Sequence, residues 1–218
     1  MLFDSHAHLE SHRYKDPIDN VIARAFDAGV SGIVHVGSGA DPAVFEEAVA
    51  LAAREPRIRA AIGCHPHEAD QASEATYEKL IRLASRPEVV AIGEIGLDYH
   101  YDFASRDGQR RAFERQLAIA EEADLPVVIH CREAHEDCLA ILGAARLSSR
   151  PGVIHCYTAD IDTARRYVAL GFLISIPGVV TFSGAGPLIE TVREMPVDRM
   201  LIDRKSTRLN SRHVSQSR

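Results

Sequence analysis

The sequence predicts a (β/α)8 barrel of the TIM type, in which parallel strands alternate with helices. Three observations support this prediction. Short apolar, β-branched runs recur along the chain, segments with apolar residues at helical spacing lie between them, and 218 residues suffice for one sizeable core. The continuous apolar runs at residues 32–34 and 127–129 are typical of strands buried on both faces of a parallel sheet. An open, doubly wound sheet is the alternative.

Strands are expected wherever a short apolar run stands between polar or turn-forming residues. This criterion gives eight strands, at residues 2–4, 32–36, 59–63, 89–93, 126–130, 153–155, 172–175 and 200–202. Eight is the number of strands in a barrel of this kind.

Helices are expected between these strands. Asp16-Pro17 and Asp41-Pro42 each resemble an N-cap followed by a proline at the first helical position. Gly171 is a natural C′ residue, because glycine readily takes the left-handed conformation that ends many helices. Apolar residues recur at helical spacing in residues 18–26, 77–84, 113–123 and 164–170.

The end of the chain departs from this pattern. TIM-type barrels typically have about 250 residues, so we expect this barrel to be incomplete at the C-terminus, with its last helix missing. Residues 204–218 have no periodicity, carry five Lys and Arg and no acid, and resemble a translated sequencing adapter. We expect a barrel over residues 1–203 and an irregular basic tail, not native, over residues 204–218; a natural basic arm for nucleic acid is the alternative. Apolar surface beside the first and eighth strands is expected to be exposed.

The charge of the chain limits how it can attract a polyanion. The net charge is −6, with 25 basic and 31 acidic residues. Without the five basic residues of the tail, 20 basic residues remain against 31 acids, and the net charge of the body is near −11. Such a body attracts nucleic acid poorly at long range, so metals and a few positive side chains must hold a polyanion locally.

Cysteine usage and the N-terminus indicate a cytoplasmic protein. No apolar stretch is long enough to span a membrane, and residues 1–4 lead into a strand without the features of a signal peptide. The four cysteines form no CxxC pair, which favours reduced thiols. We expect small buried residues at Cys64, Cys131, Cys138 and Cys156, with a ligand role as the alternative because three of them adjoin histidines.

Histidines and a glutamate stand at the ends of several predicted strands. His6 and His8 end the first strand, and residues two apart on a strand point the same way. Glu94, His130 and His155 each follow an apolar run. In a parallel barrel these positions gather at the C-terminal mouth, where active sites lie. A histidine buried in the core explains one such position, but it explains five convergent groups poorly, since several buried polar groups would all need partners.

Imidazoles together with a carboxylate suit Zn²⁺, Mn²⁺ or Fe²⁺, whereas Mg²⁺ prefers sites richer in oxygen. A carboxylate can bridge two ions, and two adjacent ions can activate a water and stabilise the leaving oxygen of a phosphate ester. We therefore expect two divalent cations whose identity, Zn, Mn, Mg or Fe, stays open.

Five motifs carry a resemblance to a known family. They are Asp4-Ser5-His6-Ala7-His8-Leu9, Gly63-Cys64-His65-Pro66-His67, Gly93-Glu94-Ile95-Gly96-Leu97-Asp98-Tyr99, Ile129-His130-Cys131-Arg132 and Ile154-His155-Cys156-Tyr157. In this order they resemble the signatures of the TatD-type metal-dependent deoxyribonucleases, which are amidohydrolase-like metal barrels. The resemblance runs from residue 1 to about residue 202.

The resemblance implies a hydrolase that cleaves phosphodiester bonds of DNA with water activated between two metals. It implies metal ligation by His6, His8, Glu94, His130 and His155. Glu94 would bridge the two ions, where many related barrels use a modified lysine. It implies DNA as the substrate, and it implies neither a membrane nor a protein partner.

Further residues are expected near the substrate. The resemblance places His65 and His67 there, where an imidazolium or N–H can hold a phosphate; an ordinary polar loop is the alternative. Arg132 is expected to grip a phosphate in bidentate fashion, with a salt bridge to Glu133 or Glu136 as the alternative.

Other polar residues are expected to play supporting roles. Asp98 and Tyr99 are expected to orient Glu94 or the substrate. Packing or surface roles are expected for His12, His35, His100 and His135.

The resemblance breaks after the eighth strand. The family has an acid, then threonine, then a metal-site aspartate; here Asp203 falls at the first acid and Lys205 at the metal-site aspartate. That aspartate usually takes the proton of the attacking water, so its loss threatens activity; Asp203 is expected to take this catalytic role if the end of the strand is shifted. Two alternatives therefore stay open: hydrolysis of a small amide, lactone or phosphate ester, and an inactive binding protein that has lost part of its site.

Overall fold

The computed structural model describes residues 2–203, which form a nearly closed barrel of eight parallel strands in sequence order. Each strand pairs with the next, from β1 with β2 to β7 with β8. Within residues 2–203, no ladder joins β8 to β1. The strands are β1 (Leu2–Ala7), β2 (Val30–Ser38), β3 (Ile58–Gly63), β4 (Val89–Asp98), β5 (Val127–Arg132), β6 (Gly152–His155), β7 (Leu173–Pro177) and β8 (Met200–Asp203).

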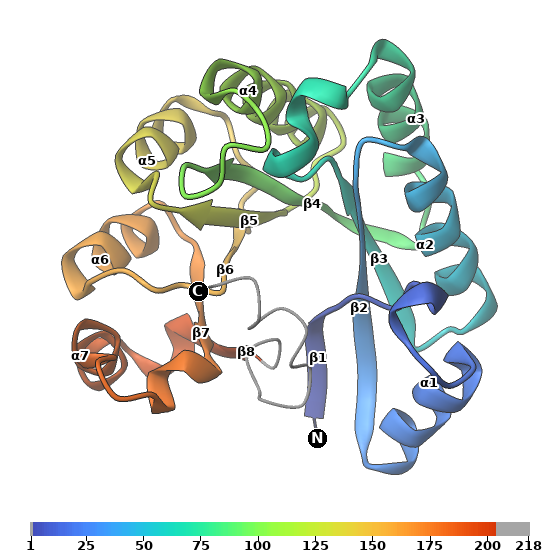
Figure 1. The fold of residues 1–218 in the computed structure, drawn as a ribbon, viewed down its shortest axis with the longest axis horizontal. Helices are drawn as coiled ribbons and strands as arrows, with labels where there is room; N and C mark the ends of the chain where they lie inside the picture. Colours follow the sequence, from blue (N-terminus) through green and yellow to red (C-terminus); the bar gives the residue numbers. More distant parts are fainter. Residues whose placement is uncertain (1, 204–218) are drawn as a thin grey trace.

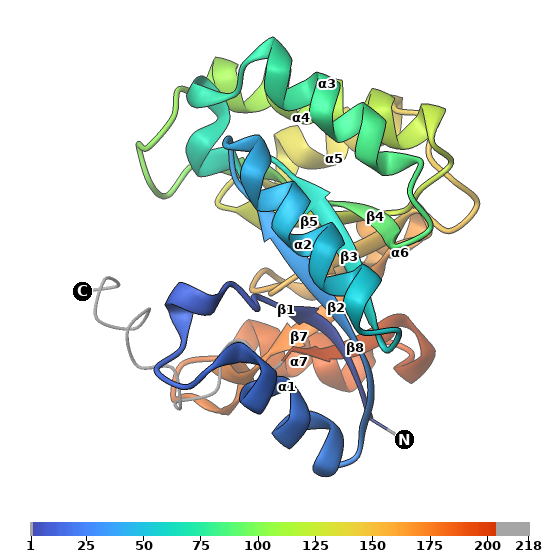
Figure 2. The ribbon, with the colours of Figure 1, turned by 90° about the vertical axis from the view of Figure 1, so that its right-hand side faces the viewer.

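Helices surround the sheet in the order of the sequence (Figure 1). The view at right angles shows α2 and α3 lying along the outside of the strands (Figure 2). The α-helices are α1 (Ile18–Asp27), α2 (Pro42–Arg54), α3 (Glu74–Ala84), α4 (Arg106–Glu122), α5 (His135–Ala144), α6 (Ile161–Ala169) and α7 (Gly186–Glu194). Short 3₁₀ turns are η1 (Ser11–Arg13), η2 (Pro66–Gln71), η3 (Gly178–Thr181) and η4 (Val197–Arg199).

The predicted barrel is confirmed, because an open doubly wound sheet would reverse its strand order and this sheet does not. Among the strands, β4 differs most from its expected bounds: it was expected to end at residue 93 but continues to Asp98. The apolar residues Ile95 and Leu97 extend the strand, so Glu94 lies inside it and not after it. Helices α5 and α7 were not expected from the spacing of apolar residues.

Local capping explains several helix ends. Asp41 caps α2 by accepting a hydrogen bond from the Ala43 N–H at 2.9 Å, as expected. Asp16 does not cap α1, because Pro17 is the N-cap residue and no side chain bonds to the first turn. Gly171 follows α6 with a φ of 92°, which confirms the predicted C′ glycine.

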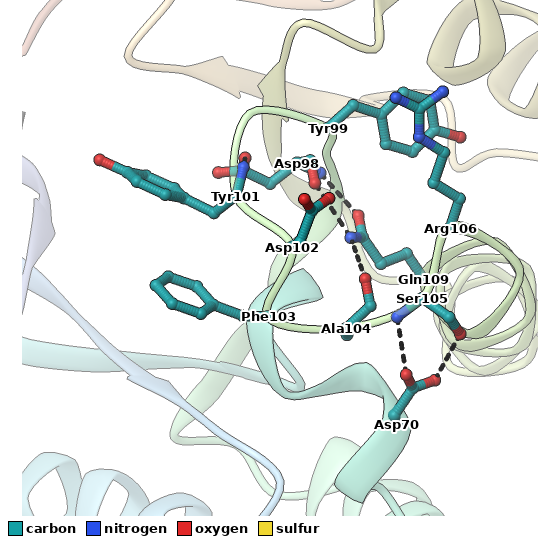
Figure 3. A pocket seen from close by; sticks show the side chains of 10 residues that line it. All are labelled: Asp70, Asp98, Tyr99, Tyr101, Asp102, Phe103, Ala104, Ser105, Arg106 and Gln109. Atoms are coloured by element: carbon teal, nitrogen blue, oxygen red, sulfur yellow. Dashed lines mark hydrogen bonds between the residues drawn. The ribbon is translucent and has the colours of Figure 1, made fainter.

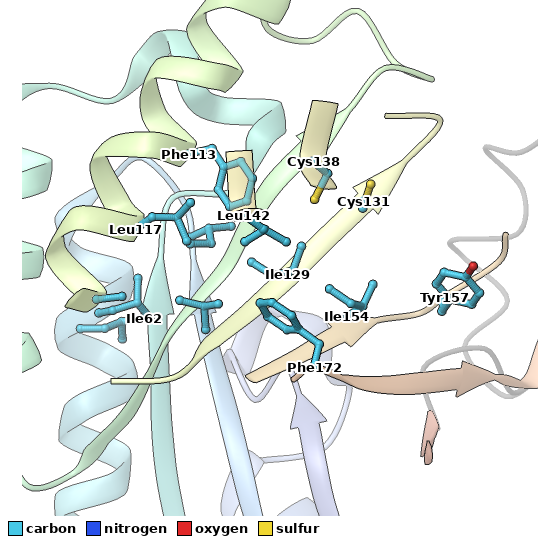
Figure 4. Close-up of a cluster of buried hydrophobic side chains, with 14 of the residues drawn as sticks. Ile62, Phe113, Leu117, Ile129, Cys131, Cys138, Leu142, Ile154, Tyr157 and Phe172 are labelled. Atoms are coloured by element: carbon cyan, nitrogen blue, oxygen red, sulfur yellow. The ribbon is translucent and has the colours of Figure 1, made fainter. Parts of the chain in front are cut away.

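The main apolar core lies between the sheet and the helices. Ile62 of β3, Ile129 of β5 and Ile154 of β6 belong to this core together with Phe113 and Leu117 of α4 (Figure 4). Fully burying an aliphatic or aromatic side chain of this kind contributes about 1.5–3 kcal/mol, so this layer supplies most of the stabilisation.

A second, small cluster fills the inside of the barrel. Its buried members are Val36, Ala61, Ala91 and Val128. Because strand side chains alternate between faces, the residues two positions after an inward Val point inward as well. His130 thus shares the inner face of β5 with Val128.

Apolar side chains are exposed along the two strands that end the sheet. Leu2 and Phe3 on β1 are 65% and 60% exposed, and Ile202 on β8 is 93% exposed. This is the exposed surface that the sequence predicts.

The expected tail, residues 204–218, and the expected absence of a last helix lie outside the described residues. Among the helices of residues 2–203, none has the length and apolarity needed to cross a bilayer.

Candidate metal centre

A bulge in β4 turns Glu94 into the barrel. Gly93 pairs with Val128 and Ile95 pairs with Ile129, so Glu94 is an extra residue between two paired positions. Regular alternation from Ala91 would point Glu94 outward, toward the helices. With the extra residue, the carboxylate instead comes among the histidines, and the side chain is 1% exposed.

Gly96 allows the same two strands to approach closely. Its φ is +134°, and a Cβ atom there would stand 2.1 Å from the carbonyl oxygen of His130. Any other residue would meet both backbone strain and this oxygen. Glycine at this position therefore brings His130 beside Glu94.

The two carboxylate oxygens of Glu94 face different histidines. Oε2 lies 3.5 Å from His6 Nε2 and 3.6 Å from His8 Nε2. Oε1 lies 3.3 Å from His130 Nδ1, 3.8 Å from His155 Nε2 and 4.0 Å from His65 Nε2. The four histidines that the sequence predicts as ligands thus converge on the carboxylate of the fifth predicted ligand, Glu94.

His65 joins this group, although the sequence suggested it for substrate binding. His6, His8 and Glu94 form one set whose donor atoms lie within 4.8 Å of one another, and His65, Glu94 and His130 form a second. Cysteine belongs to neither set. Cys64, Cys131 and Cys138 are buried as expected, whereas Cys156 is only partly buried.

The second ring nitrogens have partners that fix the direction of each imidazole. His8 Nδ1 lies 3.2 Å from the carbonyl oxygen of Val36, which can only accept, so this nitrogen carries the proton. His155 Nδ1 lies 2.9 Å from Asp203 Oδ2. In both residues Nε2 then carries a lone pair on the side of Glu94.

The donor set fits divalent cations. Within the described chain, His155 Nε2 is buried without a hydrogen-bond partner although it faces a carboxylate oxygen. The His6 and His155 rings are stacked, with centroids 3.5 Å apart. A buried nitrogen lone pair beside a carboxylate is costly unless a cation or a proton lies between them.

Asp98 holds two further histidines. Its Oδ2 lies 2.8 Å from His67 Nε2 and 2.8 Å from His130 Nε2. Burial acts to raise the pKa of Asp98, but the hydrogen bonds from His130 and His67 outweigh it and hold this pKa well below its usual range. Asp98 is therefore anionic and orients His130 toward Glu94; its contacts are with His67 and His130 rather than with Glu94, which it was expected to orient.

Burial also acts on His130 itself. It acts to lower the pKa of this imidazole, but hydrogen bonds to Asp98 and Glu94 outweigh it and raise the pKa of His130 to about 9. Without a cation, His130 is thus protonated at neutral pH.

Asp203 lies at the edge of this centre. Its Oδ2 accepts hydrogen bonds from the Cys156 N–H at 3.2 Å and the Ser175 hydroxyl at 3.1 Å, besides its contact with His155. The carboxylate is buried. These contacts suit a residue that orients His155.

Arg132 and Tyr99 have partners that the sequence did not suggest. Arg132 stacks on the Tyr101 ring, with Cζ 4.9 Å from the ring centroid. The alternative salt bridges are not formed in the described chain, because Glu133 pairs with His100 and Glu136 with Arg166. The Tyr99 hydroxyl donates to Asp137 Oδ2 at 2.7 Å rather than to Glu94.

The remaining histidines lie where packing or surface roles were expected. His35 is buried, its Nδ1 faces Ala7 O and Leu9 N, and burial lowers its pKa. His12 is exposed, His100 pairs with Glu133, and His135 lies 3.3 Å from Cys131 Sγ.

Two buried glutamines of α4 support the centre and were missed from the sequence. Gln116 accepts from the Cys64 N–H at 2.6 Å and donates to Cys64 O at 3.2 Å. Gln109 makes the same paired contacts with the backbone of Asp98, at 2.8 and 2.9 Å. They stand seven residues apart, two turns of one helix, beside the apolar residue Phe113. Polar residues on an apolar helix face are the signal that could have revealed them.

Glu10 was also missed. Its Oε1 lies 3.7 Å from His8 Nδ1, and Oε2 lies 2.9 Å from Arg13 Nε. Burial acts to raise the pKa of Glu10, but the hydrogen bond with His8 and the positive charge of Arg13 outweigh it and lower this pKa to about 2. Glu10 therefore adds a negative charge behind His8.

A cavity of about 230 Å³ opens beside the loop that follows β4. Asp98, Tyr101 and Phe103 are among the residues lining it, whereas the histidines of the centre are not (Figure 3). Asp98, which contacts His130, is thus the side chain that this cavity shares with the surroundings of the candidate metal centre.

Known proteins resemble this chain over most of its length. The family described as TatD related DNase matches residues 3–204. The uncharacterized metal-dependent hydrolase YabD of Bacillus subtilis is 39% identical over 203 residues, which are 93% of this chain and 79% of that protein. The 3'-5' ssDNA/RNA exonuclease TatD of Salmonella typhimurium is 39% identical over 204 residues, 93% of this chain and 77% of the relative.

Solved structures of TatD proteins are also similar to this chain. The TatD homolog YJJV from Escherichia coli superposes with a TM-score of 0.83 at 29% identity, covering 93% of this chain and 78% of its own. A TatD family hydrolase from Entamoeba histolytica has a TM-score of 0.75 at 23% identity, covering 93% and 72% of the two chains, which supports the fold alone. The chain therefore belongs to the TatD related DNase family of metal-dependent hydrolases and is an enzyme that acts on ester bonds.

Proposed function

We propose that this enzyme hydrolyses phosphodiester bonds of DNA with two divalent cations bridged by Glu94. The observation that carries the proposal is the division of the histidines between the two oxygens of this carboxylate. Oε2 faces His6 and His8, and Oε1 faces His65, His130 and His155. Such a division suits a carboxylate that gives one oxygen to each of two ions.

The side chains of the centre would act as follows. His6 and His8 would hold one cation and His130 and His155 the other, with His65 beside the second. When bound, such a pair of cations lowers the pKa of a water and stabilises the leaving oxygen of a phosphate ester.

Asp98 and Asp203 support these ligands. Asp98 keeps the proton of His130 on Nε2, and Asp203 keeps the proton of His155 on Nδ1. Asp203 stands at the family's first acid, two residues before the place of the metal-site aspartate, and we propose that it accepts a proton from the reaction through a water.

Nucleic acid as the substrate class rests on two kinds of support. Relatives at 38–39% identity are named exonucleases of single-stranded DNA and RNA. The mouth also carries cationic or hydrogen-bonding groups at His67 and Arg132, which suit a phosphate held locally by a body of negative charge.

The test compares Glu94→Gln with Glu190→Gln, an exposed residue of α7. We expect the wild-type protein to bind two cations per chain and to degrade DNA with Mn²⁺ in a chelator-sensitive way. Glu94→Gln should lose both cations together, as measured by elemental analysis, and lose cleavage; Glu190→Gln should keep both.

Two outcomes would contradict the proposal. If Glu94→Gln loses one cation and keeps the other, Glu94 is a terminal ligand and not a bridge. If the wild-type protein turns over an amide or lactone and leaves DNA intact, the substrate is a small molecule.

A further inference from the structure

The loop between β4 and α4 carries two aromatic side chains on the outside of the molecule. The Tyr101 and Phe103 rings are stacked, with centroids 5.2 Å apart and planes inclined by 16°. Phe103 is 63% exposed. Figure 3 shows both rings pointing the same way out of the loop, away from Asp70 and Gln109. A flat apolar surface of this size facing water is unusual for a loop that only connects two elements.

The stack has a positively charged end. The Arg132 guanidinium lies over the Tyr101 ring, with Cζ 4.9 Å from its centroid. Tyr101 in turn stacks on Phe103. The guanidinium and the two rings thus form one chain of contacts, here called the column, whose exposed member is Phe103.

The column is joined to the candidate metal centre by His67. The His67 ring stands edge-on to both aromatic rings, with centroids 5.5 Å from Tyr101 and 4.9 Å from Phe103. The same imidazole contacts Asp98, which contacts His130. One side chain therefore separates the aromatic surface from the residues around Glu94.

The loop is held in place at both ends. Asp98 Oδ1 accepts from the N–H groups of His100 and Tyr101, at 3.0 and 3.1 Å. At the other end, Gln109 donates to Ala104 O at 3.1 Å, and the Ser105 N–H donates to Asp70 at 2.6 Å. Such anchoring fixes the surface before a ligand arrives, which reduces the entropy lost on binding.

We propose that Phe103 and Tyr101 form a stacking platform for an unpaired nucleobase of the strand whose phosphate enters the metal centre. The proposal rests on the function proposed above. Stacking on an aromatic side chain stabilises each bound base by about 1–3 kcal/mol and tolerates any base. A base inside a duplex has both faces covered by its neighbours, so the platform selects single strands and strand ends. It also supplies the local affinity that an acidic body cannot supply at long range.

The test uses the full chain and oligodeoxynucleotides that carry 2-aminopurine near the 3′ end. Its fluorescence is quenched when the base stacks. We expect the wild-type protein to quench a single strand and not the corresponding duplex. Phe103→Leu should lose the quenching and raise Kd about 10-fold, as expected for the loss of one stacked base, whereas Phe103→Trp should retain both.

The matched control is Phe26→Leu. Phe26 on α1 also carries an arginine over its ring, with Arg57 Cζ at 3.6 Å, but it precedes β2 and thus lies at the other end of the barrel. This variant should bind and quench as the wild-type protein does.

A second substrate separates failure of the platform from failure of the enzyme. An oligomer of abasic sites keeps its phosphodiester bonds and has no base to stack. With Mn²⁺, Phe103→Leu should raise KM on the base-bearing strand and leave cleavage of the abasic one unchanged. If the wild-type protein cleaves the base-bearing strand and Phe103→Leu matches it in KM and quenching, the platform is disproved and the nuclease stands. If the wild-type protein neither binds nor cleaves either strand, both proposals fail.

Discussion

At the scale of single residues, the chemistry depends on which atom of each side chain faces Glu94. Its two oxygens face separate groups of histidines. In three of these histidines the ring nitrogen that faces away from Glu94 has its own partner. The pairs are His8 with Val36 O, His130 with Asp98 and His155 with Asp203. A carbonyl or carboxylate there fixes the tautomer, which decides whether a histidine can act as a ligand.

His130 provides a pH-dependent prediction at this scale. Its pKa is raised to about 9, so it is protonated at neutral pH, whereas a metal ligand must be neutral. Cation binding should therefore release its proton, and affinity should rise with pH until the pH passes that pKa. The release can be measured by calorimetry with Zn²⁺ in buffers of different ionisation enthalpy.

The matched variants are Asp98→Asn and Asp102→Asn. Asp98→Asn removes a carboxylate that raises the pKa of His130, so it should release fewer protons at neutral pH. Asp102 is exposed on the same loop, and its replacement should leave the release unchanged. Equal release from all three proteins would show that the charge of His130 is not coupled to cation binding.

At the scale of elements, α4 positions the ends of two strands. Gln116 holds the backbone of Cys64 just before His65, and Gln109 holds that of Asp98. These paired hydrogen bonds join the side chains of α4 to the backbone at the ends of β3 and β4. The helix thereby fixes loops that would otherwise be free to move.

Replacing Gln116 tests this role. Gln116→Ala leaves the Cys64 N–H and C=O without their partner inside the protein, at a cost of about 1–3 kcal/mol for each buried group. We expect a lower midpoint in urea unfolding and weaker cation binding, because His65 follows Cys64 directly. Gln71→Ala, at an exposed position in η2, should change neither. A stability loss without any change in cation affinity would limit Gln116 to a structural role.

At the scale of the whole molecule, the sheet has two ends that share no ladder within residues 2–203. The apolar side chains of Leu2, Phe3 and Ile202 lie exposed on these end strands. Exposed apolar groups on strands promote association between molecules.

Substituting Ile202 should reduce that association. Ile202→Thr keeps the β-branched shape and removes apolar surface that faces water, so we expect less aggregation with little change in unfolding free energy. The same substitution at Ile174, which is fully buried in β7, should destabilise the fold. Light scattering and urea unfolding measure the two effects. Undiminished scattering from Ile202→Thr would place the association elsewhere.

The sequence by itself determined the barrel and the positions of most site residues. Apolar runs of three and two residues stop at His130 and His155, and this pattern requires only local periodicity and the burial of apolar side chains. Local periodicity does not determine where a strand ends, as β4 shows, because an apolar segment that contains glycine can continue a strand or follow it as a loop.

Only the tertiary structure decided how the side chains face one another. Counting alternate residues points Glu94 outward, and the bulge that turns it inward is defined by the register against β5. The capture of His67 and His130 by Asp98, and the stacking of Arg132 on Tyr101, join side chains from different strands and loops. Their physical cause is the same: a periodic pattern records which residues are buried, whereas the direction of a side chain at a bulge or in a loop depends on neighbours that are distant in the sequence.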